Sequence, residues 1–361
     1  MTLDRRAFLT AAGAAGLGLV AAACGGSGDS SGSTAETSIA DGPAEPGAAA
    51  SPAAEPAGRT FPVGDAPEGI VVGTSGTAMV GLRNPDRLAI VDLASGTTTQ
   101  TVTTQGSPRH LELAGPDGPV IAPLEQTDTM LLVGFDGTVE TTVVAVGRNP
   151  HDAARCADGT IVVANELGGG VLFVRDGEIV SELPPGPVQP GGVAAVGNFA
   201  EVSDVRGLGV FIYDATTMTQ VASAPIGTQL THSIALAAPG TPAGVGAQEG
   251  VTAVADTVGG TVEILRITPQ VEQLATVETG GTPYGMGYDA ARELLLITVT
   301  GDNRLDVIDV ADPASPRILG SLPTVQQPNS VSADPTTGDL VVAGEADGLL
   351  QVIPSAMVPT R

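Results

Sequence analysis

The chain has 361 residues, of which only 2% are aromatic and none is tryptophan, while 49 are glycine and 28 are proline. This abundance of turn-forming residues predicts an all-β protein. The formal net charge is −25, with only 15 lysines and arginines. Because such a surface repels phosphate backbones, nucleic acid is excluded as an expected partner.

Residues 1–24 have the pattern of an export signal, in which Arg5 and Arg6 precede a short, weakly apolar run that ends at Cys24. The segment DRRAFL resembles a twin-arginine signal and AAAC resembles a lipoprotein box. This resemblance implies export, with a lipid on Cys24. A signal that is simply cleaved is the alternative. A membrane-spanning helix is disfavoured because the run is short and rich in Ala and Gly.

Residues 25–58 are small, polar and rich in proline. Such a segment cannot bury a core, so it predicts a disordered tether. Behind a lipidated Cys24, the tether would hold a folded domain at the outer face of the cytoplasmic membrane. The lipid anchor would then be the only contact with the membrane.

The rest of the chain, residues 59–361, repeats a pattern of short apolar strands about every 40 residues. The clearest copy is residues 281–322. One small sheet cannot bury both of its faces, so the copies have to stack on one another. Seven copies predict a seven-bladed β-propeller. The repeats start near Pro67, Pro108, Pro150, Pro190, Thr231, Pro283 and Pro328.

The two ends of the repeat region complement each other. The last repeat lacks an obvious fourth strand, and residues 60–63 precede the first repeat without a unit of their own. We therefore expect residues 60–63 to form the outer strand of the last blade, which would leave the ring without an open edge. The alternative is that residues 356–358 fill this position.

Three segments carry a resemblance to a known family. They are Asn165 after the apolar run 161–164, the sequence Val307-Ile308-Asp309, and the stretch 327–338 with its Pro-Asn-Ser-Val and Asp-Pro pairs. They resemble the YVTN-type propeller repeat, over residues 66–354. The resemblance implies an exported propeller lipoprotein of the kind found in actinobacteria, for which no biochemistry is implied.

Several cofactor signatures are missing from the sequence. It has no Cys-x-x-Cys-His segment for a covalent c-type haem, and no tryptophan to stack on pyrroloquinoline quinone. It also has no glycine-rich loop of the kind that holds nucleotide phosphates. We therefore expect no haem, quinone or nucleotide cofactor.

The three histidines of the chain all occur near the start of a repeat. His151 and His232 directly follow the start position, and His110 lies two residues after it. Inner strands line the channel of a propeller, so we expect these side chains to converge at one channel mouth. Neutral imidazoles together with a carboxylate, here Glu68 or Asp152, are ligands for zinc or copper.

Two other functions remain open for the same mouth. One is a hydrolase that resembles seven-bladed lactonases, with a histidine as base and with Arg109, Tyr284 and Asn329 binding the substrate. The other is a platform for a protein of the cell envelope. With no catalytic signature beyond these residues, the sequence favours a monomeric binding protein, with a metal ion or an envelope protein as partner, over an enzyme.

Overall fold

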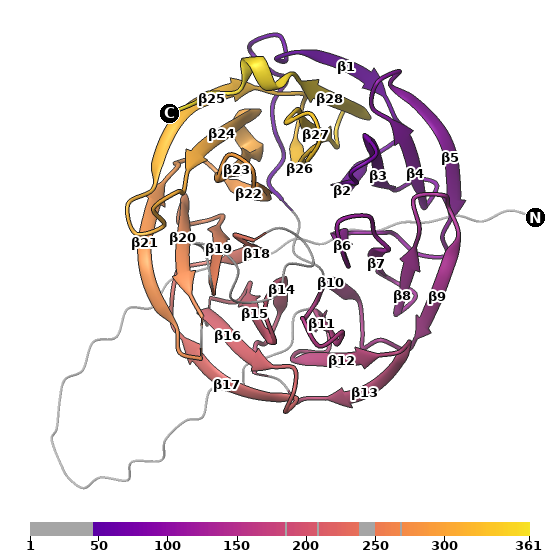
Figure 1. The fold of residues 1–361 in the computed structure, drawn as a ribbon, viewed down its shortest axis with the longest axis vertical. Helices are drawn as coiled ribbons and strands as arrows, with labels where there is room; N and C mark the ends of the chain where they lie inside the picture. The colour runs from indigo at the N-terminus through magenta and orange to yellow at the C-terminus, as the bar shows by residue number, and fades with distance from the viewer. Residues whose placement is uncertain (1–45, 185, 208, 238–249, 268) are drawn as a thin grey trace, which may run out of the picture. The chain divides into compact units, whose positions relative to one another are not determined.

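The computed structural model describes residues 46–361 except 185, 208, 238–249 and 268. All of these residues belong to one compact unit, Ser38–Arg361. Within the described part, seven four-stranded antiparallel sheets stand around a central axis as the blades of a β-propeller (Figure 1). The fold class predicted from the sequence is therefore confirmed.

The blades are numbered from the first complete repeat. Blade 1 contains β2 (Pro67–Val72), β3 (Thr77–Leu82), β4 (Arg87–Asp92) and β5 (Thr97–Thr103). Blade 2 contains β6 (Glu112–Leu113), β7 (Val120–Leu124), β8 (Thr129–Val133) and β9 (Val139–Val144). Blade 3 contains β10 (Pro150–Arg155), β11 (Ile161–Asn165), β12 (Val171–Arg175) and β13 (Glu178–Glu182). Blade 4 contains β14 (Pro190–Val196), β15 (Phe199–Asp204), β16 (Gly209–Asp214) and β17 (Thr219–Ala224).

The remaining blades follow the same order from the channel outward. Blade 5 contains β18 (Leu230–Ala235), β19 (Val251–Asp256), β20 (Thr261–Arg266) and β21 (Glu272–Glu278). Blade 6 contains β22 (Pro283–Asp289), β23 (Leu294–Val299), β24 (Arg304–Asp309) and β25 (Arg317–Pro323), with the 3-10 turn η1 (Thr300–Asp302) between β23 and β24. Blade 7 contains β26 (Pro328–Ala333), β27 (Leu340–Gly344) and β28 (Leu349–Ile353), and η2 (Ser355–Met357) follows it.

The outer strand of blade 7 comes from the other end of the chain. It is β1 (Arg59–Pro62), which pairs antiparallel with β28 so that Thr60 lies opposite Gln351. This is the position that the sequence predicted for residues 60–63. The alternative segment, residues 356–358, instead forms η2 and the residue after it.

The apolar core lies between neighbouring blades. Val162 and Phe173 of blade 3, for example, pack against Val202 and Tyr213 of blade 4, and the Phe173 and Tyr213 rings are 6.3 Å apart. The second and third strands are mostly buried on both faces, so they read largely as runs of apolar residues, as β23 does with the sequence LLLITV. Outer strands such as β5 alternate between exposed and half-buried residues, because one of their faces meets solvent.

The segment before β1 departs from the expected tether. Residues 46–57 run along blades 6 and 7 and are hydrogen-bonded to them, for example from the Ala57 amide to the Pro323 carbonyl at 2.9 Å. The tether was predicted to extend to residue 58. In agreement with its small and polar composition, Ala57 is the only residue of 46–57 that is buried. Backbone groups nonetheless find partners on the propeller.

The predicted signal segment, with Arg5, Arg6 and Cys24, lies outside the described residues, as does the tether as far as residue 45. Among the residues that are described, no helix has the length and apolar character needed to cross a membrane.

Candidate functional site

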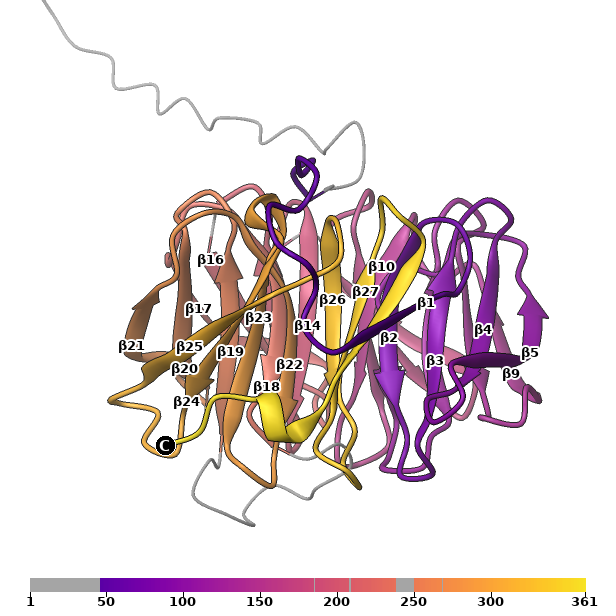
Figure 2. The ribbon, with the colours of Figure 1, turned by 90° about the horizontal axis from the view of Figure 1, so that it is seen from above.

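The inner strands all begin on one face of the ring, which we call the mouth face; it is the upper face in Figure 2. Outside blade 2, the first residue of each inner strand pairs with the end of the second strand, as Pro190 does with Asp204, and the register then shifts by one residue. In blade 2 the equivalent residue is Pro108, which bridges to Leu124 ahead of β6. In blade 5 the equivalent pair is Leu230 and Asp256. The repeat start therefore lies at Leu230, one residue before the predicted Thr231, and His232 occupies the position that His110 has in blade 2.

The structure brings the three predicted histidines together. The His110 ring lies between the other two, 4.7 Å from the His151 ring and 4.5 Å from the His232 ring, measured between centroids. Because His110 belongs to blade 2 and His232 to blade 5, these rings meet across the channel. His110 Nε2 and His232 Nδ1 have no hydrogen-bond partner among the described residues.

Arg109 and Tyr284 also meet across the channel. The Arg109 guanidinium from blade 2 donates a hydrogen bond to the Tyr284 hydroxyl from blade 6 at 3.3 Å. Both side chains are buried, and Arg109 is 0% exposed. Side chains therefore fill the channel at this level, and an incoming ligand would meet a packed layer rather than an open pore.

His151 is the residue that contacts acidic groups. Its Nδ1 lies 3.5 Å from Glu125 Oε1 and 3.4 Å from Glu166 Oε2, and the three ligand atoms all lie within 4.8 Å of one another. These separations are longer than good hydrogen bonds and are those of ion pairs. All three side chains are buried. We call Glu125, His151 and Glu166 the mouth triad.

Neighbouring groups fix the orientation of the two carboxylates. Asn149 Nδ2 donates to Glu166 Oε2 at 2.8 Å, and Gln189 Nε2 donates to Glu166 Oε1 at 3.0 Å. Arg83 Nη2 lies 3.3 Å from Glu125 Oε2. Outer-shell bonds of this kind hold ligands in a defined geometry.

The charges around the triad fix its protonation. Burial on its own would lower the pKa of His151, but the charge of Glu166 and the close polar contacts with Glu125 and Glu166 outweigh it and raise the pKa to about 9. His151 is therefore an imidazolium at neutral pH. A group that already holds its proton is a poor general base, so the lactonase-like role does not suit this histidine.

The other two histidines are neutral. Burial, followed by the charges of the neighbouring histidines, lowers the pKa of His110 well below its usual value. Burial and the His151 charge likewise lower the pKa of His232 to about 3. Neutral imidazole is the form that can bind a metal ion.

The two predicted acidic ligands lie elsewhere. Glu68 is bonded by Arg83 at 3.7 Å and by Asn329 Nδ2 at 3.4 Å, so the Arg83 side chain stands between it and Glu125. Asp152 faces blade 4, where its Oδ2 accepts a hydrogen bond from the Val193 amide at 2.8 Å. In their place the structure brings Glu125 and Glu166 to His151.

The repeat itself held the signal for these two glutamates. Each directly follows the residue that pairs with the first residue of its blade, as Glu166 follows Asn165. The same position holds Arg83 in blade 1 and Glu345 in blade 7, but uncharged residues in blades 4, 5 and 6, namely Val205, Thr257 and Thr300. Ionic groups at this position are thus confined to one side of the mouth.

No family model matches this chain, and no curated protein does so either. Solved structures show the fold. Hydrazine synthase from Kuenenia stuttgartiensis is 18% identical with a TM-score of 0.67, over 81% of this chain and 96% of that one. The Cps50 (Swd1) β-propeller domain from Myceliophteria thermophila is 13% identical with a TM-score of 0.67, over 82% and 98%. U3-55K is 11% identical with a TM-score of 0.68, over 83% and 100%. At these identities the similarity shows a β-propeller and nothing more.

Proposed function

We propose that this protein is a binding protein whose ligand is a divalent transition metal ion, such as zinc or copper, held by Glu125, His151 and Glu166. The observation that carries the proposal is the spacing of the mouth triad. Zinc bonds of 2.0–2.1 Å in a tetrahedral site place neighbouring ligand atoms about 3.3 Å apart. The distances from His151 Nδ1 to the two carboxylate oxygens, 3.5 and 3.4 Å, are close to that value.

The charge of the triad also suits a cation. Without a metal, the proton on His151 is the positive charge between two carboxylates. A metal ion would take the place of this proton and release it, as is usual when histidine becomes a ligand. His110, with its free Nε2 and its ring 4.7 Å from that of His151, is the neighbouring imidazole best placed to act as a fourth ligand.

Calorimetric titration tests the proposal. One equivalent of Zn²⁺ or Cu²⁺ should bind with sub-micromolar affinity, and His151→Ala should weaken binding by at least about 100-fold, because it removes the nitrogen ligand. Asp302→Asn is the matched control, since Asp302 lies on the mouth face but bonds Arg304 rather than the triad. An absence of both heat and thermal shift with either ion would refute the metal site.

A protein-binding role is the second candidate, and the filled channel favours it. Because Arg109, Tyr284 and the histidines close the mouth, a large partner would dock on the face rather than insert into the ring. Co-purification from detergent-solubilised envelope, compared between wild type and a variant with Glu345→Lys on the mouth face, would reveal such a partner. We expect a protein that co-purifies with the wild type to be missing from the preparation of the Glu345→Lys variant.

We further propose that the protein is an exported lipoprotein with YVTN-type repeats, which acts as a monomer at the outer face of the cytoplasmic membrane. Arg5, Arg6 and Cys24 support the export route and the anchor, and the repeat segments around Asn165 and Asp309 support the family. Labelling with a radioactive fatty acid should mark the wild-type protein and leave Cys24→Ser unlabelled. Equal labelling of both would remove the lipid anchor from the proposal.

A further inference from the structure

Residues 46–57, which we call the strap, cross the mouth face before descending beside blade 7 (Figure 2). At the mouth end the Ala49 amide donates to Gln327 Oε1 at 3.4 Å, and Gln326 Nε2 donates to the Ala49 carbonyl at 2.9 Å. Asn303 Nδ2 donates to the Ala50 carbonyl at 2.7 Å. Gln327 and Asn303 are also bonded to each other, from the Gln327 amide to Asn303 Oδ1 at 2.8 Å.

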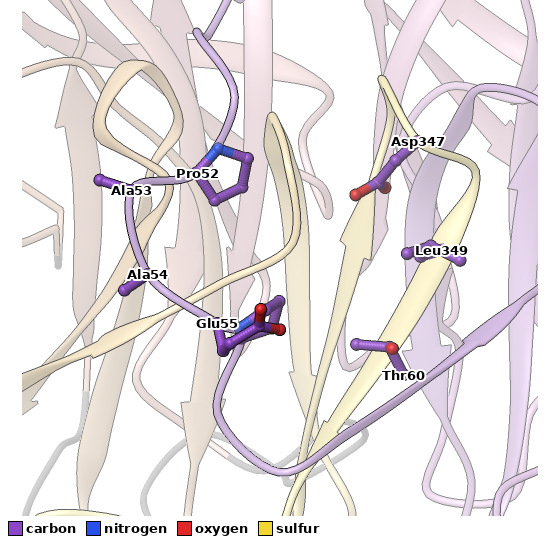
Figure 3. Close-up of a pocket in the computed structure, with 8 residues that line it drawn as sticks. Pro52, Ala53, Ala54, Glu55, Thr60, Asp347 and Leu349 are labelled. Atoms are coloured by element: carbon purple, nitrogen blue, oxygen red, sulfur yellow. The ribbon is translucent and has the colours of Figure 1, made fainter.

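The far end of the strap is attached more firmly. Ala57 is buried, its amide donates to the Pro323 carbonyl, and its carbonyl accepts from Gln351 Nε2 at 2.8 Å. Between the two ends, the strap residues Pro52 to Pro56 line one side of an open pocket of about 490 Å³, and Asp347 and Leu349 line the other (Figure 3). The mouth end therefore depends on a few polar bonds and can detach while Ala57 stays in place.

Gln327 links the strap to the mouth triad through a chain of side chains in which hydrogen-bond donors and carboxylate acceptors alternate. Its Nε2 donates to Glu345 Oε2, and the same oxygen accepts from Asn329 Nδ2 at 2.9 Å. Asn329 also reaches Glu68 Oε2 at 3.4 Å. Glu68 in turn lies 3.7 Å from Arg83, which lies 3.3 Å from Glu125. Blades 7, 1 and 2 are thus joined by one continuous network.

A metal ion on Glu125 would disturb this network at one end. The cation repels the Arg83 guanidinium, and it withdraws the Glu125 charge that holds this guanidinium. Arg83 then pairs with Glu68 alone. Asn329, displaced from Glu68, donates only to Glu345 and competes there with Gln327. Each shift is between groups already in contact, so no large movement is required.

We propose that the strap is a ligand-responsive segment, which is attached to the mouth face when the triad is metal-free and detached from it when a metal ion is bound. The proposal rests on the proposed metal site. Coupling between two sites is reciprocal, so the factor by which a metal ion weakens the strap attachment is also the factor by which detachment of the strap strengthens metal binding.

Residue-resolved amide exchange on the full chain, with and without one equivalent of Zn²⁺, measures the coupling. The Ala49 amide should exchange at least about fivefold faster with zinc, which is the lower end of usual coupling energies, while the Ala57 amide should not change. Gln326→Ala, which removes a strap bond without touching the network, should bind zinc about fivefold more tightly. Arg59→Ala, which loosens β1 from the Leu93 and Ala94 carbonyls, should leave zinc affinity unchanged.

An amide-exchange measurement without metal distinguishes the proposed coupling from the proposed metal site. Glu125→Gln removes the charge that holds Arg83, so it should speed Ala49 exchange without any metal. If zinc produces no heat but Glu125→Gln releases Ala49, the metal site is wrong and the network is right. If zinc binds and Ala49 exchange stays constant in both arms, the coupling is overturned.

Discussion

Residues Glu125 and Glu166 give His151 a different chemistry from that of the two histidines beside it. All three rings share one layer of the channel. Among the residues that the structure describes, only His151 contacts carboxylates, while His110 and His232 contact mainly other rings. The same residue type is therefore a cation at one position and a neutral group at the neighbouring positions. Local charge decides this, since burial on its own lowers the pKa of all three.

Replacing Glu166 with glutamine tests that statement. Glutamine keeps an oxygen for Asn149 but removes the charge that contributes most to raising the pKa of His151 from 6.5 to about 9. The pKa of His151 should fall by at least about one unit. A nuclear magnetic resonance titration can follow it, because the chain has only three histidines to assign. Glu345→Gln, at the equivalent position of blade 7, should leave the pKa of His151 where it is.

Glu201, in the second strand of blade 4, carries a prediction on stability. Neither carboxylate oxygen has a hydrogen-bond partner among the described residues, and burial raises the pKa of Glu201 from 4.5 to about 8. Between these two pH values the unfolded chain has lost the proton and the folded chain has kept it. Rising pH therefore lowers the free energy of unfolding across this window.

Glu201→Gln should remove this decrease in the free energy of unfolding at high pH. We expect the variant and the wild type to unfold at similar temperatures at pH 5, and the variant to have a Tm higher by roughly 3 °C at pH 8, which corresponds to about 2 kcal/mol. Calorimetry at both pH values measures it. Glu182→Gln, on an exposed strand, serves as the control. Equal Tm values for Glu201→Gln and wild type at pH 8 would mean that Glu201 is ionised and paired.

Elements, unlike the site, follow closely from the sequence. Apolar runs and turn residues marked the strands, because each blade must bury its inner and middle strands on both faces. Blade 5 lacks the proline that marks the other starts, so the sequence placed its start only near Thr231, and pairing with Asp256 fixes Leu230 as its first residue. The strap was missed because hydrogen bonds from Asn303 and Gln326 to backbone carbonyls leave no trace in its composition.

The β1–β28 pair allows a test at the scale of an element. Pro62 and Leu349 are opposite residues in this ladder, and neither is fully buried. A disulfide from Pro62→Cys and Leu349→Cys would tie together the two ends of nearly the whole propeller. It should raise stability by at least about 2 kcal/mol, since long loops gain most from cross-linking. Thermal unfolding of the oxidised and reduced double variant gives the comparison, and equal Tm values would show that blade 7 does not open first.

For the whole molecule, the count of blades, the closure of the ring and the meeting of the three histidines at the mouth were predictable, whereas the acidic partners of His151 were not. Repeats stack in sequence order, so their number defines the ring. The partners of His151 depend instead on how close the second strands of blades 2 and 3 come to the channel. That distance is set by the tilt and packing of neighbouring sheets, which no single repeat encodes, so Glu68 and Asp152 were predicted where Glu125 and Glu166 lie.

Blade 7 contains both the first and the last strand of the propeller, β1 and β28, and this arrangement has a mechanical consequence. A pull applied at residue 46 would first break the bonds of the strap to Gln326, Gln327 and Asn303, and would then act on β1. Once the strap bonds to blades 6 and 7 are broken, the ladder between β1 and β28 bears most of the force, together with the hydrogen bonds of Arg59 to blade 1. The propeller thus has a defined weak point, and tension on its N-terminal side would open the ring at blade 7 while leaving the triad of blades 2 and 3 intact.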